Sequence, residues 1–102
     1  MLDFYYLTVP IRRHILKRSV AAHLRAISID ADALEPLYRQ LYFAIRDGIL
    51  SERLRPGQRL PATRSFAQDL GLSRNTVVSA FDQLLAEGYI EGRTGAGTYV
   101  ST

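Results

Sequence analysis

Hydrophobic residues recur every three to four positions in three stretches of the chain, and each stretch predicts an amphipathic helix. The first spans residues 36–55, with its stripe on Leu37, Leu41, Ile45 and Ile49, widened by Tyr38, Tyr42 and Leu50. Pro36 suits a first helical turn, and Pro56-Gly57 ends the pattern. Gly48 lies inside this helix, where glycine costs about 1 kcal/mol relative to alanine, so we expect another segment to pack closely against it.

The second and third stretches are joined by a very short link. The second runs from Thr63 to Leu70 and the third from Ser73 to Glu87. Gly71 suits a left-handed helix end, and Ser73 can cap the helix that follows. Two helices so close in sequence cannot lie antiparallel, so the pattern predicts a helix-turn-helix. The residues expected on the buried sides of the two helices are Phe66, Ala67, Leu70, Val77, Ala80, Phe81, Leu84 and Leu85.

Two short strands are predicted after the third helix, at Tyr89–Arg93 and Thr98–Ser101, with a glycine-rich loop between them. A short extended piece is expected at Arg59–Leu60, and residues 26–32 alternate as in a linker or an edge strand. The order is helix, helix, tight turn, helix, hairpin. It predicts an α+β winged helix-turn-helix, with a three-helix core and a C-terminal β-hairpin wing.

Four polar residues open the third helix: Ser73, Arg74, Asn75 and Thr76. In a helix-turn-helix, the first residues of the second helix enter the major groove of DNA. Arginine can pair with guanine and asparagine with adenine, while serine and threonine can hold a phosphate or a base edge. A solvated first turn would explain each residue singly. Together with the glycine turn and the hairpin, the four predict a DNA contact.

Further candidates for DNA contact flank the third helix. Arg64, at the start of the second helix, is interpreted as a phosphate contact rather than an ordinary surface arginine. The loop at residues 92–98 superficially resembles a phosphate-binding loop, but it lacks the Lys-Ser/Thr ending and follows a helix. A wing that touches the DNA backbone or minor groove explains it better. Arg93 would supply charge, while Gly95 and Gly97 would permit close approach.

Composition narrows the function further. The 102 residues suffice for one domain, and the net charge of +3 comes from 13 basic residues, all arginine except Lys17. Arginine suits phosphate and base recognition. The lack of cysteine excludes disulfides, thiolate catalysis and the usual zinc sites. We expect neither enzymatic activity nor a metal, and without a run of 18 apolar residues we expect no membrane span.

Residues 1–26 differ from the rest of the chain. They contain a single acidic residue, Asp3, and five basic residues: Arg12, Arg13, Lys17, Arg18 and Arg25. The charge follows the apolar run rather than preceding it, so this segment is not a secretory signal. The expected division is a basic extension at 1–26, a linker or short strand at 27–35 and the winged helix-turn-helix at 36–102.

The run PGQRLPATRSFAQDLGLSRNTVVSAFDQLLAEGYIEGRTGAGTYV strongly resembles the winged helix-turn-helix domain of the GntR family of bacterial transcription regulators. With EPLYRQLYFAIRDGIL before it, the chain looks most like the MocR subgroup over residues 27–102. The resemblance implies sequence-specific operator binding in the cytoplasm, on the nucleoid when bound, and usually by a dimer; a homodimer of this chain stays open. By position, the family's DNA contacts fall on Arg64, on Ser73 through Thr76, and on the wing at Arg93, Thr94 and Gly95.

Three departures from the family change what is expected. Ala62 stands where serine is common, so a helix cap and phosphate contact would fall on Thr63 instead. Val78 stands where some relatives have an arginine that contacts DNA. MocR-like regulators carry an aminotransferase-like domain that binds pyridoxal phosphate, whereas this chain ends at the wing and its only lysine, Lys17, does not suit a Schiff base. We therefore expect neither a cofactor nor a small-molecule ligand in this chain.

The function predicted from the sequence is duplex DNA binding by the DNA-binding domain of a bacterial transcription regulator. Arg74 and Asn75 are the favoured base contacts, and the favoured phosphate contacts are Arg64, Ser73, Thr76 and Arg93. The alternative is a winged-helix module for protein interaction or dimerisation that does not itself bind DNA. Its docking surface would include Tyr5-Tyr6, Leu16 and Val20.

Overall fold

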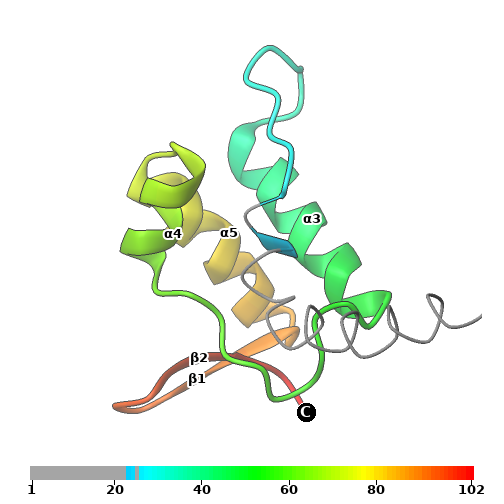
Figure 1. The fold of residues 1–102 in the computed structure, drawn as a ribbon, viewed down its shortest axis with the longest axis vertical. Helices are drawn as coiled ribbons and strands as arrows, with labels where there is room; N and C mark the ends of the chain where they lie inside the picture. Colours follow the sequence, from blue (N-terminus) through cyan, green and yellow to red (C-terminus); the bar gives the residue numbers. More distant parts are fainter. Residues whose placement is uncertain (1–22, 25) are drawn as a thin grey trace, which may run out of the picture.

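A computed structural model describes residues 23, 24 and 26–102 of the chain. In that part, three helices are followed by a two-stranded antiparallel sheet (Figure 1). The elements are α3 (Leu37–Leu50), α4 (Thr63–Leu70), α5 (Arg74–Ala86), β1 (Ile90–Arg93) and β2 (Gly97–Val100). Helix α5 lies between α4 and α3 and leads into the hairpin, so the predicted α+β winged helix-turn-helix is confirmed. None of the described helices has the length and apolar character needed to cross a membrane.

Helix α3 is shorter than the predicted helix at 36–55. It ends at Leu50, and Glu52 follows with a left-handed φ of 65°. This turn lets the N–H of Leu54 donate to the carbonyl of Gly48, at 3.0 Å, and brings the Leu54 side chain into the core. A continued helix would prevent that turn. Leu50, predicted on the buried stripe, is instead 58% exposed.

Gly48 packs closely against the turn that ends α3, as predicted. A Cβ atom at this position would lie 3.0 Å from Cδ1 of Leu54 and 3.0 Å from Nε2 of His23. Leu54 is fully buried, so it has little room to shift. Glycine is therefore needed at this position because a side chain would collide with Leu54 and His23, and not because of its backbone angles.

We expect Gly48→Ala to destabilise the fold by about 1 kcal/mol. Overpacking costs about 1–3 kcal/mol, and the better helix propensity of alanine returns about 1 kcal/mol of that. The measurement is the free energy of unfolding by urea. Gly92→Ala is the matched control, because a Cβ at Gly92 meets no atom within 4 Å. A Gly48→Ala protein that is more stable than the wild type by about 1 kcal/mol, the gain expected from helix propensity alone, would contradict the close contact.

The core joins all three helices and the base of the hairpin. Its buried side chains include Leu41 and Ile45 of α3, Phe66 of α4, and Leu84 of α5. Across the surface of this core, the hydroxyl of Tyr42 on α3 donates to the Glu87 carboxylate at the end of α5. That hydrogen bond, with a second from Gln83, lowers the pKa of Glu87. The C-terminal end of α5 is thereby tied to α3.

The turn between α4 and α5 contains the left-handed helix end that was predicted at Gly71. Gly71 adopts φ 70° and ψ 29°, and the N–H of Leu72 donates to the carbonyl of Ala67 at 2.9 Å. Ala67 of α4 and Val77 of α5 are both buried in the core, at 4% and 0% exposed. Leu85, predicted on the buried side of α5, is 40% exposed and lies outside the core.

The wing is a hairpin with a third segment beside it. Ile90 pairs with Val100 and Arg93 with Gly97, so each strand begins one residue away from its predicted position. Tyr89 is excluded from β1 because its N–H is used by α5, donating to the Leu84 carbonyl at 3.0 Å. On the other side of β2, the predicted extended piece forms a bridge from Arg59 to Tyr99. The wing therefore has three adjacent chain segments.

Residues 26–36 form turns and irregular chain, with no strand. The side chain of Gln40 on α3 takes the place of a strand partner. Its oxygen accepts from the N–H of Asp30 at 2.8 Å, while its nitrogen donates to the carbonyls of Asp30 and Glu35 at 2.9 and 2.8 Å. The predictions for Tyr5-Tyr6, Leu16, Lys17, Val20 and the basic extension concern positions outside the described residues.

Candidate nucleic-acid interface

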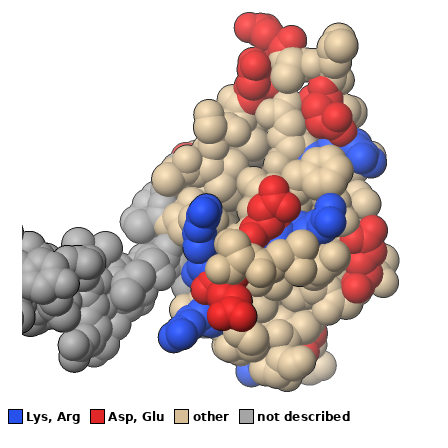
Figure 2. Space-filling model, turned by 90° about the vertical axis from the view of Figure 1, so that its right-hand side faces the viewer, with Lys and Arg blue, Asp and Glu red and all other residues tan. Residues whose placement is uncertain are grey.

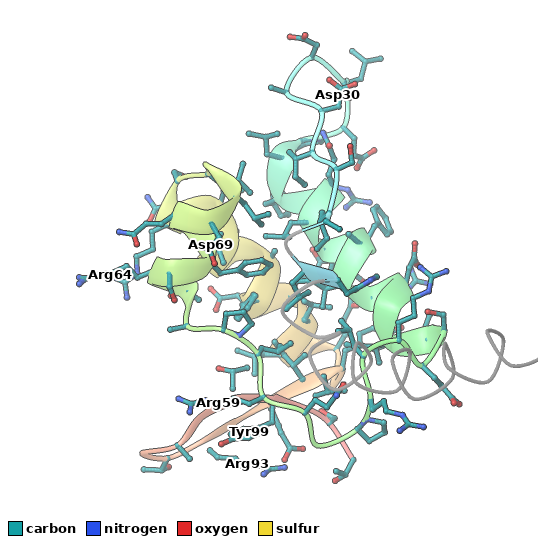
Figure 3. All side chains as sticks on the ribbon, in the orientation of Figure 1. Asp30, Arg59, Arg64, Asp69, Arg93 and Tyr99 are labelled. Carbon is teal, nitrogen blue, oxygen red and sulfur yellow. The ribbon has the colours of Figure 1, made fainter. Side chains whose placement is uncertain are left out.

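Three parts of the fold project toward one side of the molecule. These are the start of α4, the start of α5 and the tip of the hairpin, all on the left in Figure 1. Arg64 points outward on this side, and Arg59 extends the same way beside the hairpin (Figure 3). The helix-turn-helix and the wing thus form one composite surface. Residues separated by the whole length of α5 contribute to it.

The first turn of α5 presents the four polar residues as predicted. Ser73 is the N-cap, and its Oγ accepts from the N–H of Thr76 at 3.1 Å. The hydroxyls of Ser73 and Thr76 also bond to each other, at 2.9 Å. One hydroxyl hydrogen is used in that bond, which leaves the other free to donate to an external oxygen. The cap therefore rigidifies the turn and still retains a donor.

Arg74 and Asn75 are the most available side chains of this turn. Both are exposed, and within the described part of the chain neither side chain forms a hydrogen bond or an ion pair. Val77 lies directly behind them and is completely buried. The buried stripe that includes Val77 thus holds α5 against the core, while the guanidinium of Arg74 and the amide of Asn75 face outward.

The start of α4 corrects one prediction. Thr63 is not a helix cap: it is the first residue of α4, and Ala62 is the N-cap with no side-chain hydrogen bond. The extended backbone of Ala62 (φ −64°, ψ 147°) already lies outside the helix, so a threonine one position later cannot cap it. Thr63 is half-buried and Arg64 is exposed. Arg64 remains a candidate phosphate contact, and its side chain has no partner among the described residues.

Arg93 is held within the wing rather than free. Its guanidinium lies 4.1 Å from the centre of the Tyr99 ring, and its Nε donates to the Glu91 carboxylate at 3.2 Å. Beyond it, Thr94 and Gly95 form the exposed tip, where Gly95 has a φ of 72°. The wing therefore presents backbone at its tip and a stacked cation beside it.

Arg59 belongs to this surface although its sequence position did not indicate it. Its guanidinium packs on Gly97: a Cβ at Gly97 would lie 3.0 Å from Nε of Arg59 and 3.2 Å from Nη2. The only signal in the sequence was a basic residue in an extended piece before α4. Its pairing with the distant Tyr99 is what brings it to the wing.

The side occupied by α3 has a different charge pattern. Figure 2 shows the molecule from the side of α3, and basic and acidic side chains are intermixed there. Arg39 there is paired with Glu35, and its guanidinium lies 5.1 Å from the centre of the Phe43 ring. The starts of α4 and α5, in contrast, expose Arg64 and Arg74 without acidic partners among the described residues. The composite surface of α4, α5 and the wing is the better match to a polyanion.

Comparison with known proteins agrees with this geometry. The family described as "Bacterial regulatory proteins, gntR family" matches residues 37–100. The probable rhizopine catabolism regulatory protein MocR of Rhizobium meliloti is 54% identical over 74 residues, which make up 72% of this chain and 15% of that protein. The regulator TauR of Rhodobacter capsulatus is 41% identical over 81 residues, covering 74% of this chain and 17% of that protein. The chain thus spans less than a fifth of these relatives.

Solved structures show the same fold. YtrA from Sulfolobus acidocaldarius, a GntR-family transcription factor, superimposes with a TM-score of 0.71 at 33% identity, over 74% of this chain and 80% of that one. The DNA-binding domain of AraR, in complex with operator ORX1, has a TM-score of 0.64 at 26% identity, over 72% of this chain and 93% of that one.

Proposed function

Because the chain belongs to the gntR family of bacterial regulatory proteins, we propose that its winged helix-turn-helix binds duplex DNA as the operator-binding part of a transcription regulator. The observation that carries the proposal is the first turn of α5. There, Arg74 and Asn75 are exposed and unpaired within the described chain, on a helix that Val77 anchors in the core. The likeness to the DNA-binding domain of AraR, which was solved in complex with an operator, supports the binding of DNA by this fold.

The proposed roles follow from the chemistry of each side chain. With the start of α5 in the major groove, Arg74 pairs with guanine and Asn75 with adenine. Arg64 and the free hydroxyl of the Ser73–Thr76 pair bind phosphates on the flanking backbone. The wing tip, at Thr94 and Gly95, approaches the backbone or minor groove beside Arg93. Thr63, no longer needed as a cap, is assigned a phosphate contact only.

A single domain of this kind makes few contacts. We therefore expect modest affinity from the isolated chain and propose that two copies act together on an operator. Non-specific dissociation constants of roughly 10⁻⁴ to 10⁻⁶ M are typical of such binding. Function in the bacterial cytoplasm, on the nucleoid, follows from the DNA-binding proposal, and no cofactor within this chain is required for it.

Fluorescence anisotropy tests the proposal directly. The purified chain is titrated into a duplex from its own upstream promoter and into a shuffled duplex, at low and moderate salt. We expect binding that weakens steeply as salt rises, because protein cations displace counterions from DNA. Tighter binding to the promoter at both salt concentrations supports operator recognition by the chain. Absence of binding to both duplexes at high micromolar protein would contradict the proposal.

The same titration distinguishes DNA binding from the alternative function, the docking of a protein partner. A winged helix that docks a protein through apolar surface would neither bind the duplexes nor respond strongly to salt. Leu34 is fully exposed and Leu50 is 58% exposed, so the described chain does carry isolated apolar side chains on its surface. Single exposed leucines are common on folded proteins and do not by themselves form an interface.

A further inference from the structure

One face of the wing gathers cations from two distant parts of the sequence. In paired antiparallel strands, residues directly opposite each other point to the same face. Glu91 is opposite Tyr99, Arg93 is opposite Gly97, and Arg59 is opposite Tyr99 from the other side. Arg59 and Arg93 therefore share one face of the wing and flank β2. Ile90 and Val100, on the other face, are buried in the core.

The backbone around Arg59 is firmly attached to β2. The N–H of Leu60 donates to the carbonyl of Thr98 at 2.8 Å, and the carbonyl of Gln58 accepts from the N–H of Val100 at 2.8 Å. The N–H of Gly57 also donates to the carbonyl of Val100, at 2.8 Å. Arg59 thus lies on a third strand-like segment with bonds on both sides of it. Little backbone entropy remains for it to lose when a ligand binds.

The guanidinium of Arg59 lies over Gly97. A Cβ there would lie 3.0, 3.2 and 3.4 Å from Nε, Nη2 and Cζ of Arg59, so three guanidinium atoms lie close to this backbone position. Gly97 also has a φ of 114°, a backbone angle that residues with a side chain rarely adopt. The absence of a side chain at Gly97 is therefore what leaves room for Arg59 against the wing.

The two arginines of this face differ in their partners. Arg93 is paired with Glu91 and stacked on Tyr99. Arg59 is exposed and makes no ion pair with any described residue. A phosphate approaching this face would compete with Glu91 for Arg93, but at Arg59 it would meet no acidic competitor among the described residues. Of the two cations, Arg59 is the one with its charge uncompensated.

We infer that Arg59 binds a DNA backbone phosphate beside the wing and so positions the wing on the duplex. The inference rests on the proposed function and extends it to a residue outside the helix-turn-helix and the hairpin. In Figure 3, Arg59 extends toward the side on which Arg64 projects, with Tyr99 and Arg93 beside it at the hairpin. The contact is made through charge and geometry with the backbone, so it carries no base preference.

The test compares the salt dependence of DNA binding in Arg59→Gln and the wild type. Each phosphate contact contributes close to one unit to the slope of log affinity against log salt, so we expect the slope to fall by about 1 in Arg59→Gln. The loss should be equal on promoter and shuffled duplexes. Arg39→Gln is the matched control: it removes the same charge from α3 and should leave the slope unchanged. Arg59→Lys keeps the charge and should retain the wild-type slope.

Thermal unfolding of each variant accompanies the titrations. A purely structural role of Arg59 against Gly97 would weaken binding with the slope unchanged, which would overturn the inference. So would a wild-type slope and affinity in Arg59→Gln, or an equal loss of slope in Arg39→Gln. If the wild-type chain binds neither duplex, the proposed function itself fails; if it binds and Arg59→Gln behaves like it, only the role of Arg59 fails.

Discussion

Replacing Phe66 with alanine is expected to reduce the free energy of unfolding by about 3–5 kcal/mol, the usual cost of truncating a buried phenylalanine. Phe66 is 1% exposed and connects α4 to α5, with its ring centre 6.1 Å from that of Phe81. Domains of this size have stabilities of roughly 5–15 kcal/mol. A single truncation at this position therefore removes a large part of the total and loosens α4 against α5.

Urea unfolding followed by circular dichroism measures this loss. Leu34→Ala serves as the control, because Leu34 is fully exposed and its truncation should change stability by less than about 0.5 kcal/mol. A Phe66→Ala protein within 1 kcal/mol of the wild type would show that the contact between α4 and α5 does not depend on this ring. DNA binding by Phe66→Ala should weaken on all duplexes alike, because the damage is to the scaffold.

Replacing Arg74 with alanine is expected to weaken binding to the true operator by about 1–3 kcal/mol, the usual value of one bidentate contact to a base. The side chain lies at the first position of α5, is exposed and makes no bond within the described chain. Its removal should therefore leave the unfolding midpoint unchanged. Affinity for a shuffled duplex should fall much less, because only the contribution of its charge is lost there.

Anisotropy titrations of the wild type and Arg74→Ala on both duplexes measure how much affinity the mutation costs on the operator and how much on shuffled DNA. Arg39→Ala, on α3, controls for the loss of one positive charge. An operator affinity equal to that of the wild type would remove Arg74 from the set of base contacts. An equal loss on operator and shuffled DNA would instead assign Arg74 to a phosphate.

The parts of the fold that were predicted from the sequence have local causes. Gly71 and Ser73 specify the turn through their own backbone and side-chain chemistry, and the stripe through Val77 and Phe81 specifies the buried side of α5. These signals lie within a few residues of what they determine. The assignments of Arg64, of the four residues at the start of α5 and of the wing to DNA contact stay predictions until they are measured.

The errors have tertiary causes. The end of α3 depends on Glu52 accepting a left-handed backbone so that Leu54 can reach the core, which no hydrophobic periodicity reveals. Arg59 was missed because its partners, Tyr99 and Gly97, lie far away in sequence. The pairing of Arg93 with Glu91 was not foreseen either, because it depends on the two side chains sharing a strand face; the predicted contact of Arg93 with DNA stays a prediction. Thr63 was given a cap that the backbone assigns to Ala62.

The hydrogen bond from the N–H of Val100 to the carbonyl of Gln58 also bears on how the chain folds. It closes a loop that contains α4, α5 and β1, whereas the backbone hydrogen bonds of α4, of the turn and of the start of α5 join near neighbours in sequence. Closing a long loop costs entropy that only the completed sheet recovers. The helices should therefore form early, and the three-segment wing should assemble last. In hydrogen exchange under native conditions, amides of the wing should exchange sooner than those of α5.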